Sequence, residues 1–320
     1  MTAVIDAGTA VITCRDGDHT LALTDREVTA ERLIRTSRKH SFNPDTDVDW
    51  DAPPVPGLYY GPPEAGSLYE TPLWDGLSLD QQIELTKAEV ASMASFGIWS
   101  ELALMQILIQ HAYRSRYDSS HFAYALTETA DECRHSMMFG RMVKTFGLTT
   151  HRPRALEYHA LKVLGSFHDP MLMFAATLVI EEFTDAMQRI AFPDERVQPL
   201  VRHVSRIHVI EEARHIKYAR EELKRQVARS SATRRKLTAA RLAWVMSGII
   251  NRNLVHPSAY AAVGLDPKVA RQTADASPHR LATKQWASRK SMAAFEEVGF
   301  LDGRARAIWQ KAGFLAPDAG

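Results

Sequence analysis

The sequence predicts an all-α fold in which four long helices form a bundle, a wrapping segment precedes it and further helices follow it. No proline occurs between Leu73 and Arg152, and proline is the residue that helix interiors tolerate least. Beyond Leu77 the apolar residues recur at the three- and four-residue spacing of an amphipathic helix. Strand-like alternation is weak and confined to the first 25 residues.

Residues 1–77 are expected to form an N-terminal extension that wraps the core. Thr24-Asp25 opens a short helix that runs to about Arg38. Residues 43–77 contain seven of the 15 prolines, so an irregular path is expected there. Four aromatic side chains of this segment need a surface to pack against: Tyr59, Tyr60, Tyr69 and Trp74.

Residues 78–320 are expected to form the main domain, with the four-helix core over about 78–226. Turn and cap signals predict core helices over residues 78–113, 119–147 and 170–192, and a fourth from about Pro199 past Lys224. Ser119 or Ser120 caps the second of these helices, and a break near Gly97 is expected in the first.

The extra helices are expected over residues 228–320. The stretch 230–252 starts with basic residues and ends in an apolar run, which predicts a fifth long helix. Caps at Asp266-Pro267 and Ser277-Pro278 predict shorter helices in the tail.

Composition narrows the class of protein. With 39 Lys+Arg against 38 Asp+Glu the formal charge is +1, and a nucleic-acid binder would carry a basic excess. Two cysteines and a start without a basic, then apolar, leader indicate a cytoplasmic protein. The most apolar run, Leu242 to Ile250, is about half a bilayer span, so no membrane segment is expected.

Two pentapeptides carry the chemistry: Asp131 to His135 (DECRH) and Glu211 to His215 (EEARH). In each, a glutamate and a histidine are three residues apart, so both lie on one face of a helix and can bind one metal centre. A single such match is near chance for this length, whereas two matches that share the flanking acid and arginine are much less so.

Each repeat has a further glutamate 31 residues upstream, Glu101 before Glu132 and Glu181 before Glu212. Ferritin-like dimetal bundles use this ligand set, one Glu from each of two helices and Glu-x-x-His from each of the other two. Glu101 is in phase with apolar residues of a core-facing stripe, where burial is costly without a compensating metal. Two alternatives stay open. Glu101 could be a solvated acid at the edge of the apolar stripe, and Glu182 could be the ligand in place of Glu181.

His208 is a further predicted ligand, because it lies four residues before Glu212 and seven before His215 on the same helical face. Surface or packing roles are expected for the other histidines considered: His111, His121, His168 and His203. Cys133 lies about 100° from the ligand face, and we expect a packed core thiol.

The residues flanking the ligands predict a supporting layer. Histidine ligands usually donate their second ring N–H to a carboxylate. We therefore expect Asp131 to hold His215 and Glu211 to hold His135, with Arg134 and Arg214 pairing with these acids. The alternative is that all four are surface charges. Glu128, one turn before Glu132, is a further in-phase acid.

Four carboxylates balance two divalent cations, and oxygen donors with a few imidazoles and no thiolate suit iron or manganese. Iron is the first expectation and manganese the second.

The paired motifs, together with His208-x3-Glu212-x2-His215, resemble the p-aminobenzoate N-oxygenase (AurF-type) family of di-iron carboxylate oxygenases, mainly over residues 95–220. The resemblance implies seven ligands: Glu101, Glu132, His135, Glu181, His208, Glu212 and His215. It implies two Fe ions, oxo- or peroxo-bridged when oxidised, with Glu132 and Glu212 as bridges.

For function, the resemblance implies O2 activation and oxidation of an amine nitrogen, with aryl amines passing through hydroxylamine and nitroso stages to a nitro product. It also implies a homodimer. An external electron donor is expected, because no flavin or nicotinamide fingerprint occurs in the sequence. The alternatives are a di-iron C–H hydroxylase or desaturase and a non-catalytic ferritin-like iron binder.

Overall fold

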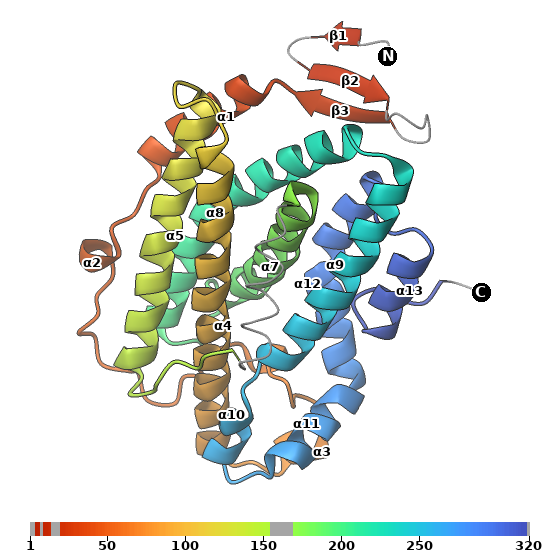
Figure 1. Cartoon of the computed structure of the whole chain (residues 1–320). Coiled ribbons are helices and arrows are strands. Elements are labelled where there is room, and N and C mark those ends of the chain that lie inside the picture. The colour runs from red at the N-terminus through yellow and green to blue at the C-terminus, as the bar shows by residue number, and fades with distance from the viewer. Residues whose placement is uncertain (1–3, 7–8, 14–19, 154–168, 319–320) are drawn as a thin grey trace.

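The computed structural model describes residues 4–6, 9–13, 20–153 and 169–318. Figure 1 shows a helical molecule with a small sheet at one end, close to the N-terminus. The predicted all-α class is confirmed, with the sheet as an addition.

The bundle consists of α4 (Leu79–Tyr113), α5 (Ser120–Thr145), α7 (Pro170–Ala191) and α8 (Pro199–Ala228). Helix α4 packs along α5, and α7 packs along α8. Short connections join the members of each pair, so the two helices of a pair run antiparallel.

The predicted caps are present at the starts of α4 and α5. Ser78 and Gln81 form a reciprocal capping box, and the Ser119 hydroxyl accepts a hydrogen bond from the backbone N–H of Phe122. Helix α5 ends at Thr145, and Gly147 follows the C-cap residue with a φ of 72°, a conformation that glycine adopts without steric cost.

The expected break near Gly97 is wrong, because α4 runs unbroken through this residue. Glycine is used here for packing. A Cβ at position 97 would lie 3.2 Å from the Phe139 ring of α5, closer than ordinary van der Waals contact. Gly97 therefore lets α4 and α5 approach each other at the level of Phe139.

The N-terminal extension begins with an antiparallel sheet of β1 (Val4–Asp6), β2 (Thr9–Thr13) and β3 (Thr20–Thr24), in which β2 lies between the other two. Helix α1 (Arg26–Lys39) follows and is capped by Asp25. The buried side chains of Leu21, Leu23 and Leu33 join the main hydrophobic core.

The segment that follows α1 contacts the bundle at several points. It contains α2 (Pro44–Asp47), the 3-10 helix η1 (Pro63–Ala65) and α3 (Pro72–Asp75). Backbone hydrogen bonds join Tyr59 to Arg196 and Gln198 in the α7–α8 connection. The Tyr60 ring packs edge-on against Phe146, with 4.7 Å between ring centroids.

The C-terminal helices are α9 (Ala232–Asn253), α10 (Pro257–Ala262), α11 (Pro267–Ala276), α12 (Pro278–Glu297) and α13 (Arg304–Lys311). Helix α12 packs against α7, and α13 packs against α9. Figure 1 shows α10, α11 and α3 gathered at the end of the bundle where α4 begins. The predicted caps at Asp266 and Ser277 start α11 and α12.

Among the described residues, α4 is the one helix long and apolar enough to cross a membrane by length and composition alone. Half of its most apolar window is buried inside the bundle, as in the core helix of a soluble protein.

The two tryptophans Trp309 and Trp244 give a matched test of the C-terminal core. Trp309 is fully buried between Phe295 and Phe314, whereas Trp244 is 73% exposed. Trp309→Ala is expected to lower the free energy of unfolding by about 3–5 kcal/mol, and Trp244→Ala by less than about 0.5 kcal/mol. Urea unfolding followed by circular dichroism measures both. Equal losses would mean that the tail is not part of the cooperative core.

Candidate metal centre

The seven predicted ligands converge inside the four-helix bundle. Helix α4 provides Glu101, α5 provides Glu132 and His135, α7 provides Glu181, and α8 provides His208, Glu212 and His215. All seven side chains are at most 2% exposed. The 31-residue interval of the sequence therefore brings residues from all four helices to one level of the bundle.

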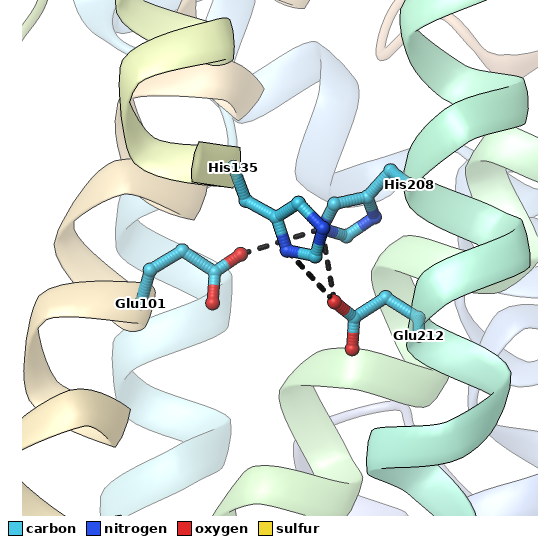
Figure 2. A group of neighbouring side chains, drawn as sticks. All are labelled: Glu101, His135, His208 and Glu212. Carbon is cyan, nitrogen blue, oxygen red and sulfur yellow. Dashed lines mark hydrogen bonds and ion pairs between the residues drawn. The ribbon is translucent and has the colours of Figure 1, made fainter. Parts of the chain in front are cut away.

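Two overlapping groups of side chains have ligand atoms that lie within 4.8 Å of one another. One comprises Glu101, His135, His208 and Glu212, and the other comprises Glu132, His135, Glu212 and His215. Figure 2 shows the first group, with side chains from α4, α5 and α8 pointing toward one another. Sharing of His135 and Glu212 between the groups is the arrangement expected for two adjacent ions.

Each histidine presents one ring nitrogen to the central carboxylates. His135 Nδ1 lies 3.1 Å from both Glu132 Oε2 and Glu212 Oε1. His215 Nδ1 lies 2.9 Å from Glu132 Oε1 and 3.1 Å from Glu212 Oε1. His208 Nε2 lies 3.3 Å from Glu101 Oε1 and 3.4 Å from Glu212 Oε1.

The other ring nitrogen of each histidine is held by a polar side chain. His135 Nε2 lies 2.8 Å from Glu211 Oε2, and His215 Nε2 lies 3.3 Å from Asp131 Oδ2. Both contacts are the ones predicted from the sequence. A histidine held in this way has its ring orientation fixed, so its inner nitrogen can bind a metal once the ring loses its proton.

The two arginines of the repeats neutralise these outer acids. Arg134 pairs with Asp131, and Arg214 Nη2 lies 3.1 Å from Asp131 Oδ2 and 3.7 Å from Glu211 Oε1. Asp131, Glu211 and Arg214 are buried, so these residues are not surface charges.

The chain just before α2 completes this layer. The Phe42 N–H donates to Glu211 Oε1 at 3.1 Å, Arg214 donates to the His40 carbonyl at 3.2 Å, and Arg134 donates to Ser41 Oγ at 3.2 Å. The N-terminal segment therefore contacts the acids and arginines that hold the histidines.

The structure separates Glu181 from Glu182. Glu181 lies beside Glu212 and Glu132, whose negative charges help to raise its pKa. Glu182 points to α8 instead, where its Oε1 accepts a hydrogen bond from Arg220 Nε at 2.7 Å. Glu181 belongs to neither of the two close groups, so it lies at the edge of the cluster.

Burial and mutual repulsion set the proton content of the cluster. Burial, with the charges of nearby carboxylates, raises the pKa of Glu101 and Glu181 well above the ordinary value. Burial opposes protonation of His135 and His215, but the adjacent carboxylates outweigh it and raise the pKa of both. Burial lowers the pKa of His208 to about 4, so this imidazole is neutral.

These residues fit a pair of divalent metal ions. Glu101 Oε2 and Glu212 Oε2 are buried and have no hydrogen-bond partner, and orphaned buried oxygens are costly. Carboxylates and imidazoles without a thiolate suit iron or manganese. The cluster is therefore able to hold a metal pair.

One contact of the site was not predicted from the sequence. The distance between Gln188 Oε1 of α7 and His208 Nδ1 is 2.7 Å. In the sequence, only the position of Gln188 seven residues after Glu181, on the same helical face, could have indicated this contact. Glu128, predicted from the sequence as an in-phase acid, is buried with one carboxylate oxygen unpartnered.

The expectation for Cys133 is wrong. Its side chain is exposed, and its Sγ lies 3.2 Å from Met105 Sδ of α4. A position about 100° from the ligand face of α5 thus lies at the exposed edge of the contact with α4, outside the core.

His111 and His121 form a group with Glu222 that the sequence reasoning missed, because they are separated widely along the chain. Arg26 donates to both Glu222 oxygens and contacts His111, so a guanidinium already occupies this group. His203 is exposed, and His168 lies outside the described residues.

A largely apolar cavity reaches the cluster from one side. Of the seven predicted ligands, Glu101, Glu181 and His208 line it. Most of the other lining residues near them are apolar side chains: Met93, Phe139, Met142, Ile180, Phe183, Met187, Val201 and Val204. His135 and His215, which contact Glu211 and Asp131, do not line this cavity.

Glu181→Gln and Glu182→Gln give a matched test of the ligand assignment. Glu181→Gln is expected to reduce bound iron below two per chain, because a carboxylate beside Glu212 is lost. Glu182→Gln breaks the pair with Arg220 and should retain two ions. Metal analysis after anaerobic Fe(II) loading measures both, and the reverse pattern would move the ligand to Glu182.

Metal affinity is expected to fall as pH falls. The raised pKa values of Glu101, Glu181, His135 and His215 mean that the metal-free cluster holds protons, which two cations must displace. Each displaced proton weakens binding by about tenfold per unit decrease in pH. Anaerobic Fe(II) titrations at several pH values measure this slope, and a flat profile would contradict it.

The chain is similar to known proteins in sequence and in structure. The chain is 28% identical over 291 residues to uncharacterized proteins of Mycobacterium tuberculosis and Mycobacterium bovis, covering 87% of this chain and 84% of each of theirs. Two solved R2-like ligand-binding oxidase variants with an anaerobically reconstituted Mn/Fe cofactor are similar in structure. They share 13% and 16% identity at TM-scores of 0.47 and 0.44, and the matches cover 87% and 84% of this chain and 94% of each of theirs.

A sequence model of one family, described as p-aminobenzoate N-oxygenase AurF, matches residues 23–299. This match spans the whole bundle, the 40–77 segment and most of the C-terminal helices. The chain therefore belongs to the AurF family of p-aminobenzoate N-oxygenases.

Proposed function

We propose that this protein is a di-iron oxygenase that uses O2 to oxidise the nitrogen of a small amine, with aryl amines as the first class to test. Membership of the AurF family supports a di-metal oxygenase. Family membership alone does not specify the atom that is oxidised or the metal, and we propose nitrogen and iron.

The observation that carries the proposal is the cavity that ends on Glu101, Glu181 and His208. An iron-storage bundle needs no enclosed apolar space beside its ions, whereas an oxygenase needs one to hold an organic substrate. The apolar walls restrict water, which would compete for the reacting position. The acids Asp131 and Glu211 do not line this cavity, so a substrate bound in it would not contact them.

The residues of the chain would divide the work as follows. Glu101, Glu132, His135, Glu181, His208, Glu212 and His215 would hold two iron ions. When bound, the ions would supply the electrons and Lewis acidity that O2 activation requires. His208 contributes a neutral donor, and Gln188 fixes its orientation through Nδ1. Asp131 and Glu211 hold the other two histidines.

The proposal includes an external electron donor, because each turnover must return the site to its reduced state. A C–H hydroxylase or desaturase would share the same centre. The identity of the oxidised atom therefore separates the two functions.

The test is a single-turnover reaction of the Fe(II)-loaded protein with labelled O2 and a panel of aryl and alkyl amines, analysed by mass spectrometry. The expected products carry labelled oxygen on nitrogen. Products oxidised only on carbon would favour a hydroxylase, and iron retained without oxidation of any amine or hydrocarbon would favour a storage protein.

Glu182→Gln and Glu181→Gln serve as the matched controls. Both remove one buried carboxylate from α7, but only Glu181 faces the cluster. Activity should survive in the first variant and be lost in the second.

A further inference from the structure

The cavity beside the metal centre has a second polar end. Five polar side chains line it away from the predicted ligands: Glu89 of α4, Asn251 of α9, and Arg280, Thr283 and Lys284 of α12. None of these five belongs to the predicted ligands or to the residues that hold them.

The two ends are well separated along the bundle. Glu89 and Glu101 both line the cavity from α4 and are 12 residues apart, which corresponds to about 18 Å along a helix. On α7, Glu181 and Ala191 line it ten residues apart, or about 15 Å. Arg280 lies close enough to Glu89 for its charge to lower the pKa of that carboxyl, so it belongs to the far end.

Two cations at this end retain capacity to bind an anion. Arg280 Nη1 is buried and makes no hydrogen bond. Its ion pair is with Asp275 at 3.4 Å, a half-exposed carboxylate that also pairs with Arg271. Asp275 does not line the cavity.

Lys284 is held by neutral groups. Its Nζ donates to Ala312 O at 2.7 Å and Asn251 Oδ1 at 3.1 Å, and it lies 5.1 Å from the centre of the Phe314 ring. Burial lowers the pKa of Lys284 to about 8, so the ammonium form predominates at neutral pH.

Glu89 is the one acid at this end among the residues that line the cavity. It accepts hydrogen bonds from the backbone N–H and the hydroxyl of Ser67, and burial raises its pKa. Among the residues that line this end, the positive charges of Arg280 and Lys284 outnumber the single negative charge of an ionised Glu89.

We propose that the cavity binds an elongated amphipathic substrate whose anionic group is held by Arg280 and Lys284 and whose amine lies at Glu101, Glu181 and His208. This deepens the proposed function and rests on it for the amine end. Apolar walls between the two ends fit an apolar body. A single aromatic ring that carries an amine and a carboxylate is far shorter than this separation, so it cannot reach both ends at once.

The test measures binding without turnover, in the purified chain with no reductant, by calorimetry. The probes are 4-aminobenzoate, 6-aminohexanoate and 12-aminododecanoate, with 12-aminododecanol as the probe that lacks the negative charge. We expect 12-aminododecanoate to bind most tightly. Arg280→Gln and Lys284→Gln should each raise the dissociation constant of 12-aminododecanoate by at least about tenfold. Neither substitution should change the dissociation constant of 12-aminododecanol.

Arg289→Gln is the matched control, because Arg289 lies on the same helix but is exposed and does not line the cavity. Its binding should equal that of the unmodified chain. Equal affinities for the three amino acids, or for the acid and the alcohol, would overturn the proposal, as would insensitivity to Arg280→Gln. Because no oxidation occurs in this assay, charge-dependent binding without later N-oxidation would refute the proposed reaction and retain the anion site.

Discussion

The burial of four glutamates in one layer of the bundle is the constraint on which the rest of the structure depends. Glu101, Glu132, Glu181 and Glu212 are all at most 2% exposed. Ionised carboxylates in such surroundings are unstable unless a cation or hydrogen-bond donors compensate them. Three imidazoles provide part of the compensation, retained protons provide another part in the metal-free chain, and two metal ions would replace those protons.

Around the four glutamates, residues of opposite charge alternate with increasing distance from the centre. Each of His135 and His215 lies between a central glutamate and an outer acid, and Arg134 and Arg214 pair with the outer acids. In this order each of the two histidines has an acid on both sides, and each outer acid has an arginine partner. This order also explains why the two pentapeptides contain all the types of residue that the layer needs.

Much of this could be predicted from the sequence, because it depends on helical period alone. The spacing of Glu132 and His135 fixes their common face whatever the partner helix is, and capping residues such as Ser78 mark the ends of helices locally. Features that depend on how one helix rotates or docks against another could not be predicted. Gln188 reaches His208 only through the relative rotation of α7 and α8, and Arg280 reaches the cavity only because α12 docks along α7. Gly97 was misread as a break because its partner, Phe139, is distant in sequence.

The contacts of residues 40–42 with the centre have a consequence for how the site tolerates change. Two of the three contacts, the His40 carbonyl and the Phe42 N–H, belong to the backbone. Backbone contacts do not depend on the identity of the side chain. Residues 40 and 42 can therefore be substituted without loss of these contacts, as long as the path of the backbone is preserved. The four helices moved alone into another scaffold would lack these groups. The four helices alone would therefore not reproduce the site, and a design that grafts it into another scaffold would have to include residues 40–42.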